Sequence, residues 1–178
     1  MKNIFTLGLL FFCLEMSAQK DSMRVVVNDS TVFWHKIKII RNDTINGEVR
    51  AVYLSDSSKT AYVKNYYNGW QNGVYKSYYP NGRTMEKIIY QKGKRNGEYT
   101  LYKFDGTVLI KGVYEEDLKN GFWIHKGYRI QGKYKNGLKQ GKWKWYYAED
   151  KYYQYVFEQG KIIKSINAAP AYLFRDLP

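Results

Sequence analysis

The stretch NGVYKSYYPNG, residues 72–82, places two Asn-Gly pairs nine residues apart, with strand-forming residues between them. Asn-Gly is the strongest short turn signal because both residues tolerate a positive φ. In the second pair, Pro80 sets φ for the second position of a type I turn, and Gly82 supplies the left-handed residue of a bulge. The stretch therefore predicts two turns, at Asn72–Gly73 and at Asn81–Gly82, around one β-strand.

The same pattern recurs along the chain. With Gly73 as an anchor, glycines follow at intervals of 24, 24 and 20 residues, and a fainter unit begins 26 residues earlier. A bulky apolar residue stands two positions after each anchor, and a turn residue stands four positions before it. Residues of the same type that recur at the same positions relative to each anchor form columns, and several such columns identify an internal repeat. The anchors are Gly47, Gly73, Gly97, Gly121 and Gly141; the apolar residues are Val49, Tyr75, Tyr99, Trp123 and Trp143; the turn residues are Asp43, Gly69, Gly93, Asp117 and Gly137.

Each unit is predicted to form a β-hairpin, because the segments between turns are rich in aromatic and β-branched residues. A further turn residue follows nine positions after most anchors, as at Gly82 and Gly106. The third unit is shorter, and residues 125–129 (HKGYR) are expected to close a tighter hairpin. One hairpin cannot bury its apolar face alone, whereas stacked hairpins can. We therefore predict an all-β fold, an elongated antiparallel β-meander of stacked hairpin repeats over residues 47–164.

Alternation of side chains along a strand assigns the two faces of this sheet. In residues 142–147, Trp143, Trp145 and Tyr147 share one side. Lys142, Lys144 and Tyr146 share the other side, as Lys76 and Tyr78 do in an earlier unit. One face is thus expected to be aromatic and the other to carry lysine with tyrosine.

The flanking segments are predicted to differ from the repeats. Residues 1–19 combine Lys2, an apolar run of eleven residues at 4–14 and small residues near Ala18, which is typical of a secretory signal peptide. Residues 20–46 are expected to form an N-terminal β-hairpin cap with Asn28–Ser30 as its turn. Residues 165–178 are expected to form a C-terminal cap or a tail. The resulting localisation is export, to the periplasm, the outer envelope or the medium.

Composition limits the chemistry. The chain has 178 residues, a formal net charge of +13 and 19 tyrosines. Its one cysteine, Cys13, lies within the predicted signal peptide and follows Phe12, whereas a lipoprotein signal places a small residue there. Cleavage would leave no cysteine, which excludes disulfides, thiolate metal sites and cysteine nucleophiles.

The repeat units resemble a known family. Their first half follows NG-x-[YW]-x-x-Y-[YK]-x-[ND]-G and their end follows Y-x-x-G, which is similar to the MORN-repeat variant of bacterial proteins often labelled YwqK-like antitoxins. The resemblance covers residues 40–164 and is clearest over 66–160. It implies an elongated antiparallel meander and no catalytic residue, because the shared positions are turn glycines and packing aromatics. An antitoxin role would require a cytoplasmic partner, which fits poorly with an exported chain.

The sequence predicts no catalytic, cofactor or metal site. His35 and His125 stand 90 residues apart, and two histidines without a third ligand do not make a usual zinc site. The acidic residues cluster at 115–117 and 149–150, where a carboxylate pair could in principle serve in glycoside hydrolysis. Asp117 and Asp150, however, occupy turn columns of the repeat, and aspartate is itself a good turn residue. We therefore do not expect an enzyme.

The basic aromatic surface is the remaining candidate. Residues 72–164 hold 19 Lys and Arg against 9 Asp and Glu. We expect a protein-binding or scaffold module of the cell envelope. The alternatives are binding of an anionic membrane surface or a polyanionic glycan, and lysines that only solvate the outer face; nucleic acid is not expected for an exported chain. The candidate binding face is Lys76, Tyr78, Tyr102, Lys142, Lys144 and Tyr146, and the structural repeat positions are Gly73, Tyr75, Gly82, Gly97, Tyr99, Gly106, Gly121, Trp123, Gly141 and Trp143.

Overall fold

The computed structural model describes residues 22–26, 32–42 and 45–167, and side chains from residue 45 to residue 167. The described residues form fourteen strands and no helix, so they contain no helix that could cross a membrane. The strands are β1 (Ser22–Val26), β2 (Val32–Asn42), β3 (Gly47–Tyr53), β4 (Thr60–Tyr67), β5 (Trp70–Gln71), β6 (Gly73–Tyr78), β7 (Thr84–Gln91), β8 (Lys94–Tyr102), β9 (Val108–Glu115), β10 (Leu118–His125), β11 (Ile130–Lys135), β12 (Leu138–Tyr146), β13 (Tyr152–Glu158) and β14 (Lys161–Ile166).

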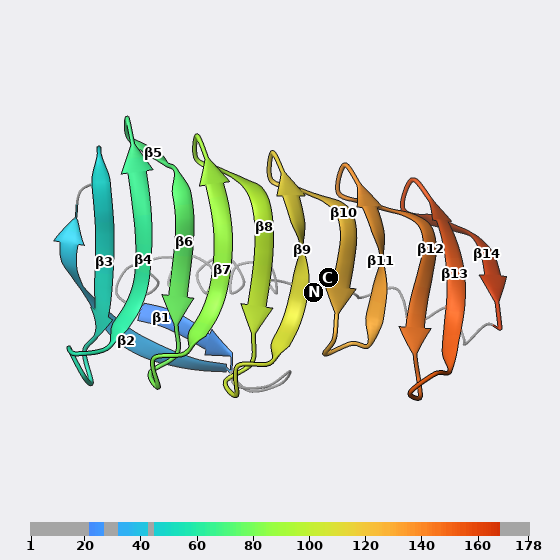
Figure 1. Ribbon diagram of the computed structural model, residues 1–178, viewed down its shortest axis with the longest axis horizontal. Helices are drawn as coiled ribbons and strands as arrows, with labels where there is room; N and C mark the ends of the chain where they lie inside the picture. The colour runs from blue at the N-terminus through green and yellow to red at the C-terminus, as the bar shows by residue number, and fades with distance from the viewer. Residues whose placement is uncertain (1–21, 27–31, 43–44, 168–178) are drawn as a thin grey trace, which may run out of the picture.

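The strands lie side by side in chain order and form one open antiparallel sheet (Figure 1). Only the short β5 lies off this path, because it pairs with β4 alone. Apart from β5, strands that are neighbours in the sheet follow one another in the sequence, so strand pairing among the described residues joins each unit only to the units before and after it. The predicted all-β meander of stacked hairpins is confirmed.

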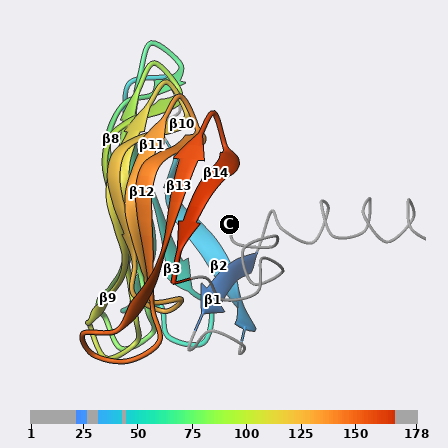
Figure 2. The same cartoon turned by 90° about the vertical axis from the view of Figure 1, so that its right-hand side faces the viewer.

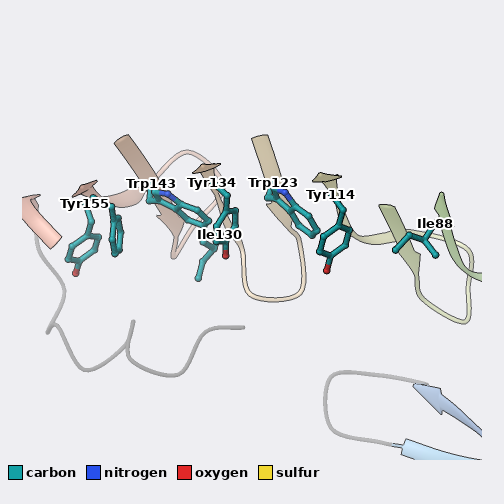
Figure 3. Packing of buried hydrophobic residues seen from close by; sticks show 8 residues of the cluster. Ile88, Tyr114, Trp123, Ile130, Tyr134, Trp143 and Tyr155 are labelled. Atoms are coloured by element: carbon teal, nitrogen blue, oxygen red, sulfur yellow. The ribbon is translucent and has the colours of Figure 1, made fainter. Parts of the chain in front are cut away.

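The first hairpin lies apart from the plane of the others. β1 pairs with the first half of β2, and the second half of β2 pairs with β3. Figure 2 shows this hairpin on one side of the sheet, the same side to which the buried aromatic residues point in Figure 3. The predicted N-terminal hairpin is therefore present as paired strands. Its predicted turn at residues 28–30, the predicted signal peptide at 1–19 and most of the C-terminal segment, 168–178, lie outside the described residues.

At one end of the strands, the chain reverses through two-residue turns. In each turn both loop residues have a positive φ, which is the type I′ geometry that suits the twist of a hairpin. Asp117, with a φ of 70°, fills the position that glycine takes in the other turns, as the repeat columns predict. The loops are Asn68–Gly69, Lys92–Gly93, Glu116–Asp117, Asn136–Gly137 and Gln159–Gly160.

Longer turns connect the strands at their opposite end. The N–H of Gly82 donates to the carbonyl of Tyr79 at 2.8 Å, and the N–H of Tyr79 donates to the carbonyl of Arg83, which confirms the predicted turn at Asn81–Gly82. Gly106 closes the corresponding turn of the next unit by donating to the carbonyl of Lys103. The third unit closes with the four-residue loop 126–129, so the tighter hairpin expected there is also confirmed.

The prediction of a hairpin turn at Asn72–Gly73 is wrong. These residues connect β5 to β6, and both strands run along the same neighbour, β4. The N–H of Asn72 donates to the carbonyl of Asn65 in β4 at 2.8 Å, so the chain continues in the same direction. The reversal is already complete at Asn68–Gly69. The anchor glycine instead marks an irregularity within one strand, as Gly121 does where the register with β9 shifts.

This irregularity joins each unit to the next. The second loop residue of each type I′ turn donates its N–H to the carbonyl of the residue two positions before the anchor glycine of the preceding unit. The five bonds span 2.8–3.0 Å: Gly69 to Ile45, Gly93 to Gln71, Asp117 to Arg95, Gly137 to Lys119, and Gly160 to Lys139. The irregularity at each anchor glycine therefore allows a hydrogen bond between units and also shapes the strand of its own unit.

Aromatic side chains form the core on one face, which we call the aromatic face (Figure 3). Trp123 and Trp143 are each 1% exposed, whereas Tyr75 and Tyr99, at the equivalent positions, are partly buried and pack against the same cluster. Neighbouring rings meet mostly edge to face, as in the Tyr134–Trp143 pair with centroids 4.9 Å apart. The predicted aromatic column is thus the core. The cluster comprises Ile88, Tyr114, Trp123, Ile130, Tyr134, Trp143, Tyr155 and Phe157.

A smaller cluster fills the N-terminal end of the sheet, around Tyr53 and Tyr79. The hydroxyl of Tyr53 donates to the carbonyl of Tyr78, and the hydroxyl of Tyr79 donates to the carbonyl of Tyr102 at 2.7 Å. Each bond joins one unit to the next. The tyrosine ring thus contributes buried apolar area, and its hydroxyl adds a hydrogen bond between units. Tyr147, assigned to the aromatic side, is half exposed and lies against Tyr153, in the turn between β12 and β13.

Candidate binding surface

A line of directly opposed residues crosses the face of the sheet opposite the aromatic face. Directly opposed residues of antiparallel strands share a face, so register partners can be followed from strand to strand. No acidic residue occurs in this line, which we call the lysine row, and its face the lysine face. The row consists of Arg50, Val63, Lys76, Lys87, Thr100, Lys111, Ile124, Gln131, Lys144 and Gln154.

The lysines of this row are not neutralised by carboxylates. Arg50 forms an ion pair with Glu48 at 3.0 Å, but none of the four lysines forms one with any residue in the described part of the chain. Lys76 and Lys87 lie directly opposite each other, an arrangement in which like charges repel. Lys144 places its Nζ 4.1 Å from the ring centre of Tyr152. The row therefore concentrates unpaired positive charge on an open face.

Tyrosines run beside the lysine row. Tyr78, Tyr102 and Tyr146 each lie two residues beyond a member of the row, on the same strand and face. Tyr146 lies opposite Tyr152, with ring centres 5.4 Å apart, and its hydroxyl accepts a hydrogen bond from Nε2 of Gln131 at 2.9 Å. We call Tyr78, Tyr102, Tyr146 and Tyr152 the tyrosine row. Half-buried phenol rings beside free ammonium groups are suited to contact with a partner.

The six predicted binding residues all lie on the lysine face, but in two groups. Lys76, Tyr78 and Tyr102 belong to β6 and β8, whereas Lys142, Lys144 and Tyr146 belong to β12. Strands β9, β10 and β11 lie between the groups. Lys142 stands beside the lysine row rather than in it, because its register partner is Val156. The predicted residues are therefore parts of one long surface and not one compact site.

Lys87 and Lys111 connect these groups, and sequence reasoning did not select them. Both stand 14 residues after an anchor glycine, at Gly73 and Gly97, on the second strand of their hairpins. The first-strand members of the row stand three residues after successive anchors: Arg50, Lys76, Thr100, Ile124 and Lys144. The two columns were present in the sequence. Their alignment into one line was not, because it depends on the register between strands.

Cations on the aromatic face have a different role. Two positions before three anchors stand Arg95, Lys119 and Lys139, and each covers an aromatic ring. Nζ of Lys119 lies 5.0 Å from the ring centre of Trp123, and Nζ of Lys139 lies 5.3 Å from that of Trp143. Burial lowers the pKa of both lysines. These cations are packed against the core and are not free for a partner.

His125 is the one histidine whose side chain the structure describes. His125 is 3% exposed, lies against Trp123, and has its pKa lowered to about 4, chiefly by burial. It is therefore neutral at physiological pH and screened from solvent. The side chain of His35 lies outside the described residues. Asp117 accepts a hydrogen bond from Nε of Arg95 at 2.8 Å, which lowers the pKa of its carboxyl, and it serves the turn as predicted.

The described side chains also contain no group of three or more potential metal ligands. No protein-family model and no curated protein matches this chain. The resemblance to MORN repeats accordingly stays a prediction from the repeat columns. The lysine face provides the strongest indication of function.

Proposed function

We propose that this chain is an exported, non-enzymatic scaffold of the cell envelope that binds an acidic partner protein through its lysine face. The observation that carries the proposal is the lysine row, in which Lys76, Lys87, Lys111 and Lys144 have no carboxylate partner among the described residues. A chain that needed lysine only for solubility would gain by interspersing acidic residues along the row, since opposed like charges destabilise a sheet.

Electrostatics explains what such a row contributes to binding. Aligned charges of one sign add their potentials, which raises the association rate with an oppositely charged surface and selects against partners of the same sign. Exposed single ion pairs contribute little, about 0–1 kcal/mol each. Several pairs made together, with the tyrosine row packed beside them, can supply a specific interface. Tyrosine is among the residues enriched in protein–protein interfaces.

A charge-reversal variant tests the proposal. The row variant is Lys76→Glu, Lys111→Glu and Lys144→Glu combined. Its matched control combines Lys59→Glu, Lys92→Glu and Lys151→Glu, three exposed lysines in turns outside the row, so that the net charge changes equally. Each purified protein is immobilised and incubated with envelope extract, and the retained proteins are identified by mass spectrometry. Circular dichroism confirms that both variants are folded.

We expect one or more acidic proteins to be retained by the wild type and by the control but lost by the row variant. Retention of the same proteins by all three would contradict the proposal, because the lysine row would then be irrelevant to binding. Export is tested separately by fractionating cells and determining the N-terminus of the protein. A mature N-terminus at residue 19 or 20 is expected, and an intact Met1 in the cytoplasmic fraction would contradict export.

A further inference from the structure

We infer that the partner presents an extended acidic segment that lies across the strands along the lysine row, with a carboxylate at about every third residue. This inference rests on the proposed function and specifies its ligand. Arg50 and Lys144 are separated by eight strand-to-strand steps. At about 4.8 Å per step, the row is roughly 38 Å long.

The spacing of the cations indicates what kind of chain fits. Five cations over roughly 38 Å give a mean separation of about 10 Å, with single gaps of one to three strand steps, or about 5–14 Å. An extended polypeptide advances about 3.3 Å per residue, so carboxylates at every third position recur at about the same distance. Each strand of a DNA duplex carries one charge per roughly 3.4 Å of helix axis and would leave most of its charges without a partner. The row therefore matches a moderately acidic peptide better than a densely charged polymer.

Apolar side chains between the cations support a polypeptide. Ile124 belongs to the row, between Lys111 and Gln131. Phe122 and Val113 lie next to it on the same face and are 49% and 41% exposed. Aromatic side chains such as Phe122 are enriched at the centre of protein–protein interfaces, where most of the binding energy is concentrated. We expect the bound segment to place an apolar residue here, between its acidic residues.

Acidic residues limit where the segment can lie. Glu98 is exposed on the lysine face, two residues before Thr100 of the row, and Glu48 stands two residues before Arg50. Both lie on the side of the row away from the tyrosine row. A carboxylate-bearing chain is repelled from that side and attracted to the lysines. The carboxylates of the segment are thus confined to the lysine row and the tyrosine row. Phe122 and Val113 lie on the other side of the lysine row, beside Glu98, so only an uncharged, apolar side chain of the segment can contact them.

Two synthetic peptides of the same composition test this geometry. Each is about 12 residues long, which matches the row at about 3.3 Å per residue. Each contains four glutamates, one central leucine, and serine or glycine elsewhere. In the spaced peptide every third residue is glutamate, and in the clustered peptide the four glutamates are consecutive. Binding of the labelled peptides to the full chain is measured by fluorescence anisotropy at two salt concentrations.

We expect the spaced peptide to bind at least about fivefold more tightly than the clustered peptide, and to lose affinity as salt is added. The combined Lys76→Glu and Lys111→Glu variant should weaken its binding by about tenfold or more. Phe122→Ser, a change at a half-exposed side chain, should weaken it severalfold while leaving the fold intact. Unchanged binding by Phe122→Ser would overturn the apolar contact.

Equal affinity for the two peptides would overturn the extended arrangement. Binding of inorganic polyphosphate, without binding of either peptide, would overturn the choice of a polypeptide. If neither peptide binds while the envelope partners are still captured through the lysine row, the inference fails and the proposed function stands. If the row variant still captures the partners, the proposed function itself fails.

Discussion

The indole ring of Trp123 lies on the backbone of Gly112, so closely that a Cβ at this glycine would come within 2.1 Å of the ring. Trp143 and Gly132 repeat the relationship at 2.2 Å. In an earlier unit Tyr99 takes the place of the tryptophan, and its register partner is Ile88. The larger tryptophan ring thus lies on a glycine of the preceding strand, whereas the smaller tyrosine ring lies opposite an isoleucine. The indole N–H of Trp123 donates to the carbonyl of Val113 at 3.1 Å and fixes the ring there.

Gly112→Ala is therefore expected to destabilise the fold by about 1–3 kcal/mol, the usual cost of overpacking. The same change made in a Trp123→Ala background should cost close to nothing, because the ring that the methyl group meets is gone. Chemical denaturation of the wild type, the two single variants and the double variant measures this coupling. Additive effects of the two changes would show that the contact does not limit the residue at position 112.

Burial of the tryptophan column is tested by Trp143→Ala. Trp143 is 1% exposed, and removing its side chain should lower the free energy of unfolding by about 3–5 kcal/mol. Trp70 is 60% exposed and provides a matched control, for which we expect a loss below about 1 kcal/mol. Denaturant midpoints of the two variants make the comparison. Similar losses for both would mean that the aromatic face does not form the core.

Two anchor glycines should differ in their tolerance of a side chain. Gly121 has a φ of 66° with no atom near its Cβ position, and asparagine adopts such angles readily. Gly97 has a φ of 139°, and its Cβ would lie 2.9 Å from that of Ile89. We expect Gly121→Asn to cost about 1 kcal/mol or less, and Gly97→Asn to cost more than about 2 kcal/mol. Thermal denaturation of both variants should rank them in this order; the reverse order would contradict the assigned backbone geometry.

Stability should fall at alkaline pH. Burial raises the pKa of Tyr53, Tyr79 and Tyr134 to about 12, from 10.0. A pKa raised in the folded state gives stability that is present below pH 10.0 and is lost as the pH rises toward about 12. The lowered pKa values of Lys119 and Lys139 act in the opposite sense, but only up to pH 10.5. The exposed Lys94, whose pKa is raised by Glu116, contributes little because its ion pair is solvated, so the loss above that pH belongs chiefly to the buried tyrosines.

Urea denaturation at a series of pH values, with tyrosinate absorbance followed in parallel, measures this loss. Tyr79→Phe removes one of the buried phenols whose pKa is raised and should make the decline above pH 10.5 shallower, although the variant also loses the hydrogen bond to Tyr102. The slope of stability against pH is therefore the quantity to compare. A wild-type stability that stayed constant up to pH 12 would be inconsistent with buried phenols.

Several features of this fold could be predicted because they depend on neighbours in the chain. The Pro80–Gly82 turn follows from φ preferences of its own residues, and the opposite sides of Lys142 and Trp143 follow from alternation along one strand. The error at Asn72–Gly73 has a physical reason. Asn-Gly fits either a tight turn or a bulge, and only the completed turn at Asn68–Gly69 decides between them.

The repeat, most of the turns and the two faces could be predicted from the amino-acid sequence, because they arise from local backbone preferences and side-chain alternation. Only the folded sheet shows which residues of different strands lie opposite one another. Register depends jointly on the two-residue turns and on the shift at each anchor glycine, as between Asn120 and Ile124. That register placed Trp123 on Gly112, and it aligned Lys76, Lys87, Lys111 and Lys144 into one row from units of unequal length.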